Sequence, residues 1–235
     1  MNTPNPYAPR PPAMSPLPGV AADAEFSVFA ILADAWTLSD GCKGLFLGLY
    51  AIVFVVMWLA QWVAISALGL GASVSGPLGL LAWQVLAAAF VYPFLAGVMA
   101  LAIRRVDGLP VRASDVLGHG VPLPQVVLLG ALLTLATTAG FALLLLPGLY
   151  LSVALMFALP LLVDRRLGAV AALTTSWRAV HPRWFRCAGL MCLLGVMLAL
   201  GSMIFIGLIW ALPVSSLALA VAYRRLFPAT AGAAP

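Results

Sequence analysis

The chain has 235 residues, 64% of them hydrophobic and 8% charged, with a formal net charge of +5 and a mean hydropathy of +1.10. Soluble globular domains carry about 25% charged residues, so this composition excludes an ordinary soluble domain. Because lipid leaves no water to bond exposed backbone groups, proteins cross membranes as helices or closed barrels. Barrel strands alternate apolar and polar residues, whereas runs such as 45–60 are apolar on every side. The sequence therefore predicts an all-α membrane protein.

The first 22 residues differ from the rest of the chain. They contain seven prolines and no periodic apolar pattern. This composition predicts a disordered, Pro-rich cytoplasmic tail, and the stretch 9–12 leaves open a docking motif for a partner. We therefore divide the chain into this tail at 1–22, a membrane domain at 23–227 and a short C-terminal tail at 228–235.

Three stretches contain no Asp, Glu, Lys or Arg: 44–103, 116–163 and 187–223, which hold 60, 48 and 37 residues. One crossing of the roughly 30 Å hydrocarbon layer needs about 20 apolar residues, so each stretch suits two crossings. The sequence predicts six transmembrane helices as three hairpins, with Pro147-Gly148 as the turn of the second hairpin. The expected spans are 45–68, 78–103, 124–146, 148–163, 187–203 and 207–223.

All twelve basic residues fall outside these spans, on one side of the three hairpins. Each hairpin ends in an arginine pair: Arg104-Arg105, Arg165-Arg166 and Arg224-Arg225. Because Lys and Arg accumulate in cytoplasmic loops, both termini are expected in the cytoplasm. The positive charge is thus a signal of sidedness, and we expect no nucleic acid partner.

Two segments outside the hairpins, 24–38 and 168–185, have apolar residues at helical spacing. In the second segment Leu173, Trp177 and Val180 share a face turned away from Arg178. Helices of this kind lie in the membrane interface, with tryptophan at headgroup depth. We expect two amphipathic interfacial helices, one before the first hairpin and one before the third.

One cluster in the second amphipathic segment combines cations with indole rings. Arginine and histidine can contact phosphate or headgroup carbonyls, and tryptophan suits the same depth. The alternatives are a plain membrane-surface anchor and a specific site for an anionic lipid headgroup or a protein partner. The candidate contact residues are Trp177, Arg178, His181, Arg183, Trp184 and Arg186.

Catalytic, metal and cofactor sites are not expected. His119 and His181 lack metal-ligand spacing, Ser176 has no evident base, and Asp164 is expected to pair with the adjacent Arg165-Arg166. The three cysteines form neither a disulfide framework nor a zinc pattern. We expect no enzyme activity.

Transport is the second functional alternative. Ion-coupled carriers usually hold an ionisable group within the bilayer, and the expected spans contain no Asp, Glu or His. A groove open to one side would instead favour a small transporter or a lipid-translocating protein. Its expected lining is Gln61, Gln84, Thr137 and Thr138.

Three motifs carry a family resemblance: Leu-Pro-Gly-Leu-Tyr-Leu at 146–151, Ala-Leu-Pro-Leu-Leu-Val-Asp at 158–164, and Ala-Leu-Thr-Thr-Ser-Trp-Arg-Ala-Val-His-Pro-Arg-Trp-Phe-Arg at 172–186. Over about residues 25–227 the chain resembles the uncharacterised six-span inner-membrane proteins of bacteria called YciC-like. It also resembles the membrane domain fused to some glycerophosphodiester phosphodiesterases, but the soluble phosphodiesterase domain is absent from this chain. The resemblance implies a multi-pass protein of the bacterial inner membrane and no established reaction.

Together these patterns predict a membrane module without catalytic activity. We expect it to face lipids, including anionic headgroups, or to bind a protein partner or a second copy of itself. The alternative is a small transporter or lipid-translocating protein.

Overall fold

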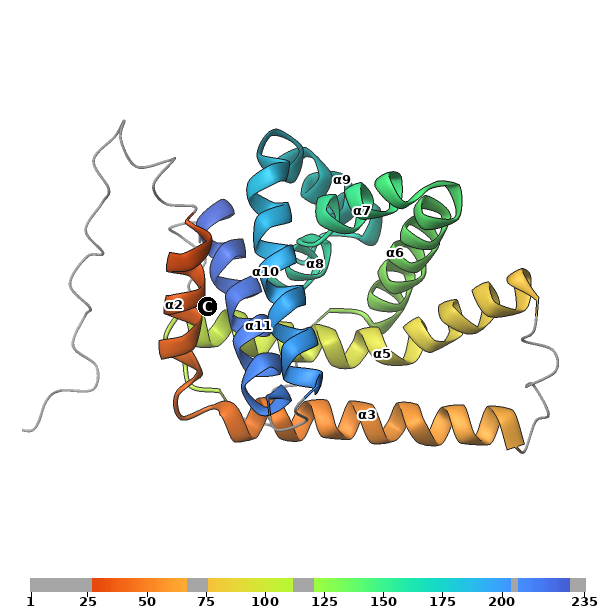
Figure 1. Ribbon diagram of the computed structural model, residues 1–235, viewed down its shortest axis with the longest axis horizontal. Coiled ribbons are helices and arrows are strands. Elements are labelled where there is room, and N and C mark those ends of the chain that lie inside the picture. The colour runs from red at the N-terminus through yellow and green to blue at the C-terminus, as the bar shows by residue number, and fades with distance from the viewer. Residues whose placement is uncertain (1–26, 67–75, 112–120, 204–206, 229–235) are drawn as a thin grey trace, which may run out of the picture.

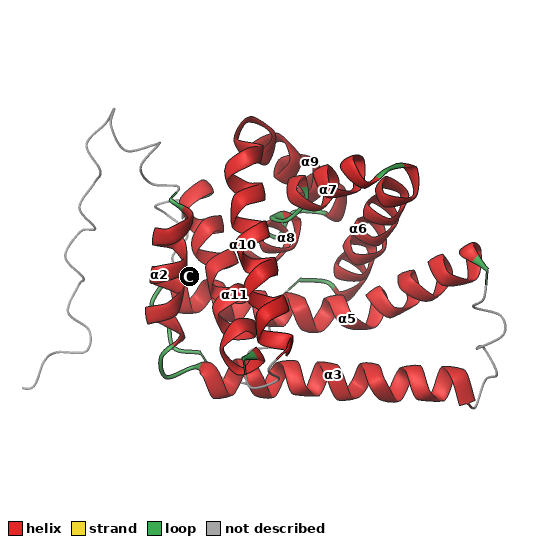
Figure 2. Ribbon diagram, in the orientation of Figure 1, coloured by secondary structure: helices red, strands yellow, loops and turns green. Residues whose placement is uncertain are grey.

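The computed structural model describes residues 27–66, 76–111, 121–203 and 207–228, and within these residues every regular element is a helix (Figures 1 and 2). The tail predicted at 1–22 and nearly all of the one at 228–235 lie outside the described residues. The helices are α2 (Val28–Ser39), α3 (Lys43–Ser66), α5 (Pro77–Val106), α6 (Leu123–Leu143), α7 (Leu145–Ala154), α8 (Ala158–Arg165), α9 (Ala169–Val180), the 3-10 turn η2 (His181–Arg183), α10 (Trp184–Met203) and α11 (Leu208–Leu226). The predicted all-α class is confirmed.

Five helical stretches of the described residues are long and apolar enough to cross a membrane. They are Lys43–Val63, Gly79–Val106, Leu123–Leu143, Leu145–Arg165 and Ala169–Met203. The sixth expected span, α11, is not among them, because its 19 residues include Pro213 and end in Arg224 and Arg225. Several helices can therefore span a membrane, while six crossings in three hairpins are not confirmed.

The fourth expected span is broken into α7 and α8 at residues 155–157. Pro160 explains the break, because a proline cannot donate to the carbonyl four residues earlier and its ring clashes with that carbonyl. Ser176 of α9 bonds the backbone at the break: its Oγ donates to Ala154 O at 2.9 Å and accepts from the Phe157 N–H at 3.2 Å. A hydroxyl on a neighbouring helix is a common partner for a backbone group next to proline in an apolar surrounding.

The helices do not run in one direction. In Figure 1, α3 and α5 run along the long axis of the view and project away from the rest of the molecule, whereas α2, α10 and α11 run across that axis. The apolar window of α3 is only 6% buried, and Phe54, Trp58 and Trp62 are 72%, 59% and 58% exposed. Thus α3 presents apolar side chains on nearly all sides, as a helix surrounded by lipid does.

The core forms around α11, which packs against α2, α3, α5 and α10. Tyr223 and Leu217 of α11, Phe46 of α3 and Leu101 of α5 are completely buried. The expected interfacial helix at 24–38 is observed in part as α2, in which Ile31 and Ala35 are buried while Phe29 and Trp36 are 77% and 50% exposed. Because α2 packs on α11, the side with Ile31 and Ala35 contacts protein.

Close glycine contacts form two of the helix connections. A Cβ atom built on Gly140 would lie 2.9 Å from Gly148 Cα, and one on Gly207 would lie 2.6 Å from Gly201 Cα. Both distances are shorter than a carbon–carbon contact allows. Glycine at these positions therefore lets α6 meet α7, and α10 meet α11, at close range.

Candidate functional site: an aromatic and arginine cluster

Tyr150 of α7 is the centre of the predicted cluster. Its Oη accepts a hydrogen bond from Trp177 Nε1 at 2.9 Å and lies 2.7 Å from His181 Nδ1. Its ring stacks on Trp184 with a centroid separation of 6.0 Å, and its carbonyl oxygen lies 3.4 Å from the indole nitrogen Nε1 of Trp184. We call Tyr150, Trp177, His181 and Trp184 the aromatic base.

The hydrogen bonds of the aromatic base form a chain. Trp177 Nε1 can only donate, so the Tyr150 hydroxyl accepts from it and can donate its own hydrogen to a neutral His181 at Nδ1. Pro182 lies inside η2, between α9 and α10, and the 3-10 turn joins the two helices so that His181 and Trp184 both contact Tyr150. Three helices thus fix the positions of these rings.

The arginines of the cluster lie on the outside of this base. Arg178, Arg183 and Arg186 are exposed, and Phe185 beside them is 86% exposed. A hollow of about 450 Å³ is lined by Pro182, Arg183, Phe185 and Arg186. We call Arg178, Arg183, Phe185 and Arg186 the arginine surface. Arg178 and Arg183 form no hydrogen bond or ion pair with the described part of the chain.

The structure thus brings all six predicted residues to one place, although it divides them by role. Trp177, His181 and Trp184 form the base, and the three arginines are exposed on the surface. Sequence reasoning missed Tyr150, which lies in the fourth expected span and was not included in the cluster. Its position two residues after Pro147-Gly148 was the available signal, but nothing local indicates a contact 31 residues away.

The predicted lipid-facing side of α9 is wrong in part. The buried face of α9 consists of Ala169, Ala172, Ser176 and Val180, so Val180 points into the protein while Trp177 is exposed. These residues follow the three- and four-residue spacing of a helix face, and most are small, which allows close packing against α8. Of the predicted apolar stripe, Val180 therefore contacts neighbouring helices, whereas Trp177 stays exposed.

The same contacts change the expected placement of the second hairpin. Tyr150 is the sixth residue of α7, about 9 Å along the helix from the α6–α7 turn at 1.5 Å per residue, and its Oη lies 2.7 Å from His181 Nδ1. The hydrocarbon layer is about 30 Å thick, so the α6–α7 turn and the cluster cannot lie on opposite faces of a membrane. The reason is the course of α9, which packs against both α8 and α7. Helix α9 begins beside α6, where Gln125 Oε1 accepts from the Ala169 N–H at 3.1 Å. It ends near Tyr150 of α7, to which Trp177 donates.

A second charged group lies where α5, α8 and α11 end. The Arg224 guanidinium bonds both carboxylate oxygens of Asp107, at 2.9 and 2.7 Å, and both of Asp164, at 2.7 Å each. The Tyr223 hydroxyl donates to Asp164 at 2.7 Å. We call Arg224, Asp107 and Asp164 the arginine clamp. Asp164 therefore pairs with Arg224, and the expected pair with its neighbours Arg165-Arg166 is wrong.

Burial and charge act in opposite directions on the clamp. The side chain of Arg224 is 15% exposed and that of Asp164 is 18% exposed. Burial lowers the pKa of the Arg224 guanidinium, but the hydrogen bonds and charges of Asp107 and Asp164 outweigh burial and raise that pKa above its ordinary value. Arg224 therefore stays charged and holds the three helix ends together.

Two further arginines attach α2 to this end of the molecule. Arg105 donates to Leu38 O at 3.1 Å and to Asp40 O at 2.9 Å, which satisfies carbonyls at the C-terminal end of α2. Arg225 forms an ion pair with Asp34 of α2. Each of the three arginine pairs thus has at least one member that binds another part of the protein, since Arg165 of the second pair donates to Pro228 O at 3.4 Å.

The residues expected to line a transport groove separate. Thr138 Oγ1 donates to Gln84 Oε1 at 2.9 Å, so α5 and α6 share one polar contact. Thr137 instead donates to its own helix, at Leu133 O, and Gln61 is exposed on α3. The structure therefore brings together two of the four residues.

Among the described residues, no three His, Cys, Asp or Glu side chains lie together as a metal site requires. Comparisons with protein-family models, curated proteins and solved structures found no match to this chain. The functional argument therefore depends on the chemistry of the residues described above.

Proposed function

We propose that this chain is a multi-pass protein of the bacterial inner membrane that acts without catalysis as a lipid-facing module. Five stretches of suitable length and apolarity support insertion, and α3 offers apolar side chains on nearly every side. The arrangement of the basic residues supports cytoplasmic termini. Binding of a protein partner, or of a second copy of the chain, is the alternative use of the same surfaces.

The observation that carries the proposal is the arginine surface. It combines exposed arginines with the exposed ring of Phe185, and Trp177 and Trp184 of the aromatic base directly precede Arg178 and Phe185 in the chain. Cations attract anionic headgroups, while aromatic rings favour the interface just below them. We propose that this surface contacts phosphate groups of anionic lipids.

We further propose that the α6–α7 turn lies on the cytoplasmic side, next to the arginine surface. Leu143, Leu144, Leu145 and Leu146 form an exposed apolar tip at this turn. Exposed leucines suit a shallow contact of this tip with the headgroup region of the inner leaflet. In this arrangement α6 to α9 do not form the complete second hairpin of the six-span prediction.

Lipid translocation or small-molecule transport is the second candidate. It is supported by the Gln84–Thr138 contact between α5 and α6, which puts two polar side chains within apolar helices. Polar contacts between membrane helices commonly serve packing alone, at about 0.6 kcal/mol each. The arginine surface therefore supports the lipid-facing module better.

Native mass spectrometry of the full chain in mild detergent tests the proposal by comparing bound phosphatidylglycerol with bound phosphatidylcholine. We expect a preference for phosphatidylglycerol that the triple variant R178Q/R183Q/R186Q loses. At roughly 1 kcal/mol for each basic residue near anionic headgroups, the loss in affinity is on the order of 100-fold. Added salt should weaken the preference of the unmodified chain.

The variant R104Q/R165Q/R166Q is the matched control, because it removes three positive charges elsewhere and should keep most of the preference. Equal losses in both triple variants would show that net charge, and not the arginine surface, attracts the lipid. An unchanged preference in R178Q/R183Q/R186Q would overturn the proposed role of these arginines.

A further inference from the structure

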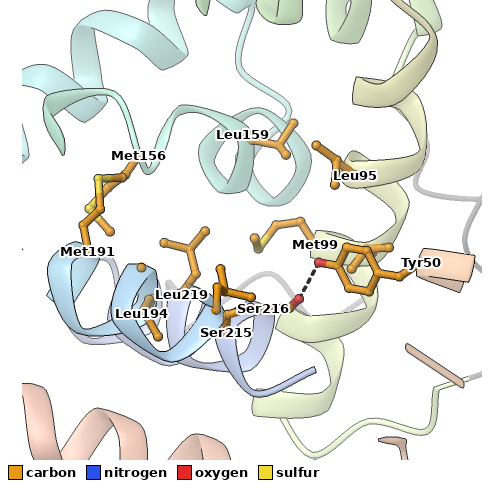
Figure 3. Close-up of a pocket in the computed structure, with 13 residues that line it drawn as sticks. Tyr50, Leu95, Met99, Met156, Leu159, Met191, Leu194, Ser215, Ser216 and Leu219 are labelled. Carbon is orange, nitrogen blue, oxygen red and sulfur yellow. Dashed lines mark hydrogen bonds between the residues drawn. The ribbon is translucent and has the colours of Figure 1, made fainter. Parts of the chain in front are cut away.

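A cavity of about 370 Å³ lies within the helices, between α3, α5, α8, α10 and α11 (Figure 3). Its walls are apolar except for Tyr50, Ser215 and Ser216. Met99, Met156 and Met191 point into it from different elements (Figure 3). Methionine side chains are flexible and polarizable, and they adapt to apolar ligands of variable shape.

The hydroxyl groups in the wall already have partners. Tyr50 Oη and Ser216 Oγ lie 2.7 Å apart, and Ser215 Oγ and Ser216 Oγ each lie 2.9 Å from Leu212 O. Among the described residues, no charged side chain lines the cavity. Apolar cavities of this kind stay dry and take up apolar molecules, so the wall suits an uncharged hydrocarbon chain better than water or an ion.

The cavity lies at a suitable depth for such a chain. Tyr50 is seven residues along α3 from Lys43, or about 10 Å at 1.5 Å per residue, and Ser216 is eight residues before Arg224, or about 12 Å. Half of a hydrocarbon layer is about 15 Å thick. A lipid whose headgroup lies level with these basic residues can therefore reach the cavity with its acyl chain.

The wall is open at α10. A Cβ atom on Gly195 would meet no other atom within 4 Å, and the neighbouring Val196 and Leu200 are exposed apolar residues. The cavity is thus continuous with a surface that faces acyl chains if the chain lies in a bilayer. We propose that this cavity binds one acyl chain of a membrane lipid, an inference that rests on the proposed membrane insertion.

The test uses the full chain in vesicles of phosphatidylcholine that carries a diazirine in its acyl chain. After irradiation, mass spectrometry of peptides locates the cross-links. We expect more cross-links for each residue in the cavity wall of α10, at 191–198, than on the exposed side of α3. Gly195→Leu places a side chain in the opening. If this side chain keeps two methylene groups of the acyl chain out of the cavity, the cavity cross-links should fall about tenfold.

Gly189→Leu is the matched control on the same helix. A Cβ atom there has its nearest neighbour, Val28 Cγ2, at 4.0 Å, residue 189 does not line the cavity, and both variants gain helix propensity. Cross-links that stay unchanged in Gly195→Leu, or that are no more frequent in the cavity wall than on α3, would overturn the inference. The cross-link map of the unmodified chain decides this even if a variant does not fold.

The same map separates this inference from the proposed membrane insertion. Cross-links on α3 but not in the cavity wall would overturn only the cavity inference, whereas the absence of cross-links at both places would contradict membrane insertion itself.

Discussion

The arginine clamp and the arginine surface use the same residue type in different ways. In the clamp, the side chain of Arg224 is 15% exposed and its guanidinium bonds two carboxylates from two other helix ends. In the arginine surface, Arg178 and Arg183 are exposed and bond no described residue. In the sequence, the arginines of both regions are equivalent signals of sidedness. The comparison teaches that they differ in the structure: Arg224 holds the protein together, whereas Arg178 and Arg183 remain available to a ligand.

The clamp should contribute most to stability. Arg224→Gln leaves Asp107 and Asp164 close together without their cation, which costs about 2–3 kcal/mol, between the values for exposed and buried ion pairs. Unfolding by sodium dodecyl sulfate in mixed micelles, followed by tryptophan fluorescence, measures this loss. Arg183→Gln is the control and should change the free energy of unfolding by less than about 0.5 kcal/mol. Equal losses at both positions would remove the distinction between the two regions.

The aromatic base should depend on the Tyr150 hydroxyl. Tyr150→Phe removes the bonds to Trp177 and His181 and should cost about 1–2 kcal/mol, at roughly 1 kcal/mol for each hydrogen bond. Tyr92→Phe is a matched control, because the hydroxyl of Tyr92 bonds no described residue. The same unfolding assay separates the two variants, and a larger loss for Tyr92→Phe would contradict the proposed role of Tyr150.

The arginines that bind α2 should have a smaller and local effect. Arg105→Gln removes the bonds to the end of α2, and we expect a loss of about 1 kcal/mol confined to that helix. Hydrogen–deuterium exchange should become faster in 28–39 and stay unchanged in α10. Arg178→Gln is the control, because Arg178 is exposed and bonds no described residue. Faster exchange throughout the molecule would mean that Arg105 supports the whole fold.

The same variant should expose Cys42. Burial raises the pKa of the Cys42 thiol, while the charge of Arg105 and its hydrogen bond act to lower it. A raised pKa means less of the reactive thiolate at pH 7.5, so Cys42 of the unmodified chain should react slowly with a maleimide. Because burial is the larger cause, Arg105→Gln should increase the rate at Cys42. A decrease would show that the charge of Arg105 matters more than the contact with α2.

The parts of the fold that the sequence predicts well are those set by local pattern. Long uncharged runs predicted α3, α5 and α6, because backbone bonding in apolar surroundings requires helices. The six cluster residues lie within ten positions of one another, so one helix end brings them together. Their membership could therefore be predicted from spacing alone.

The parts that the sequence did not predict depend on contacts between distant segments. Arg224 lies 117 residues from Asp107 and 60 from Asp164, and no local pattern assigns these partners. The buried side of α9 has the same periodicity whether it faces lipid or protein. Pro160 was visible in the sequence, but whether a proline only bends a helix or breaks it depends on a partner such as Ser176.

The most direct test of the central claim is the side of the membrane on which the α6–α7 turn lies. Single cysteines at Leu145, Phe185 and Gly76, in a background without Cys42, Cys187 and Cys192, can be labelled in intact cells with an impermeant maleimide. We expect Gly76→Cys, at the start of α5, to react from outside. Leu145→Cys and Phe185→Cys should react only after the cells are permeabilised, because Tyr150 holds the turn beside the arginine surface. Labelling of Leu145→Cys from outside, with Phe185→Cys protected, would support three complete hairpins and contradict this account.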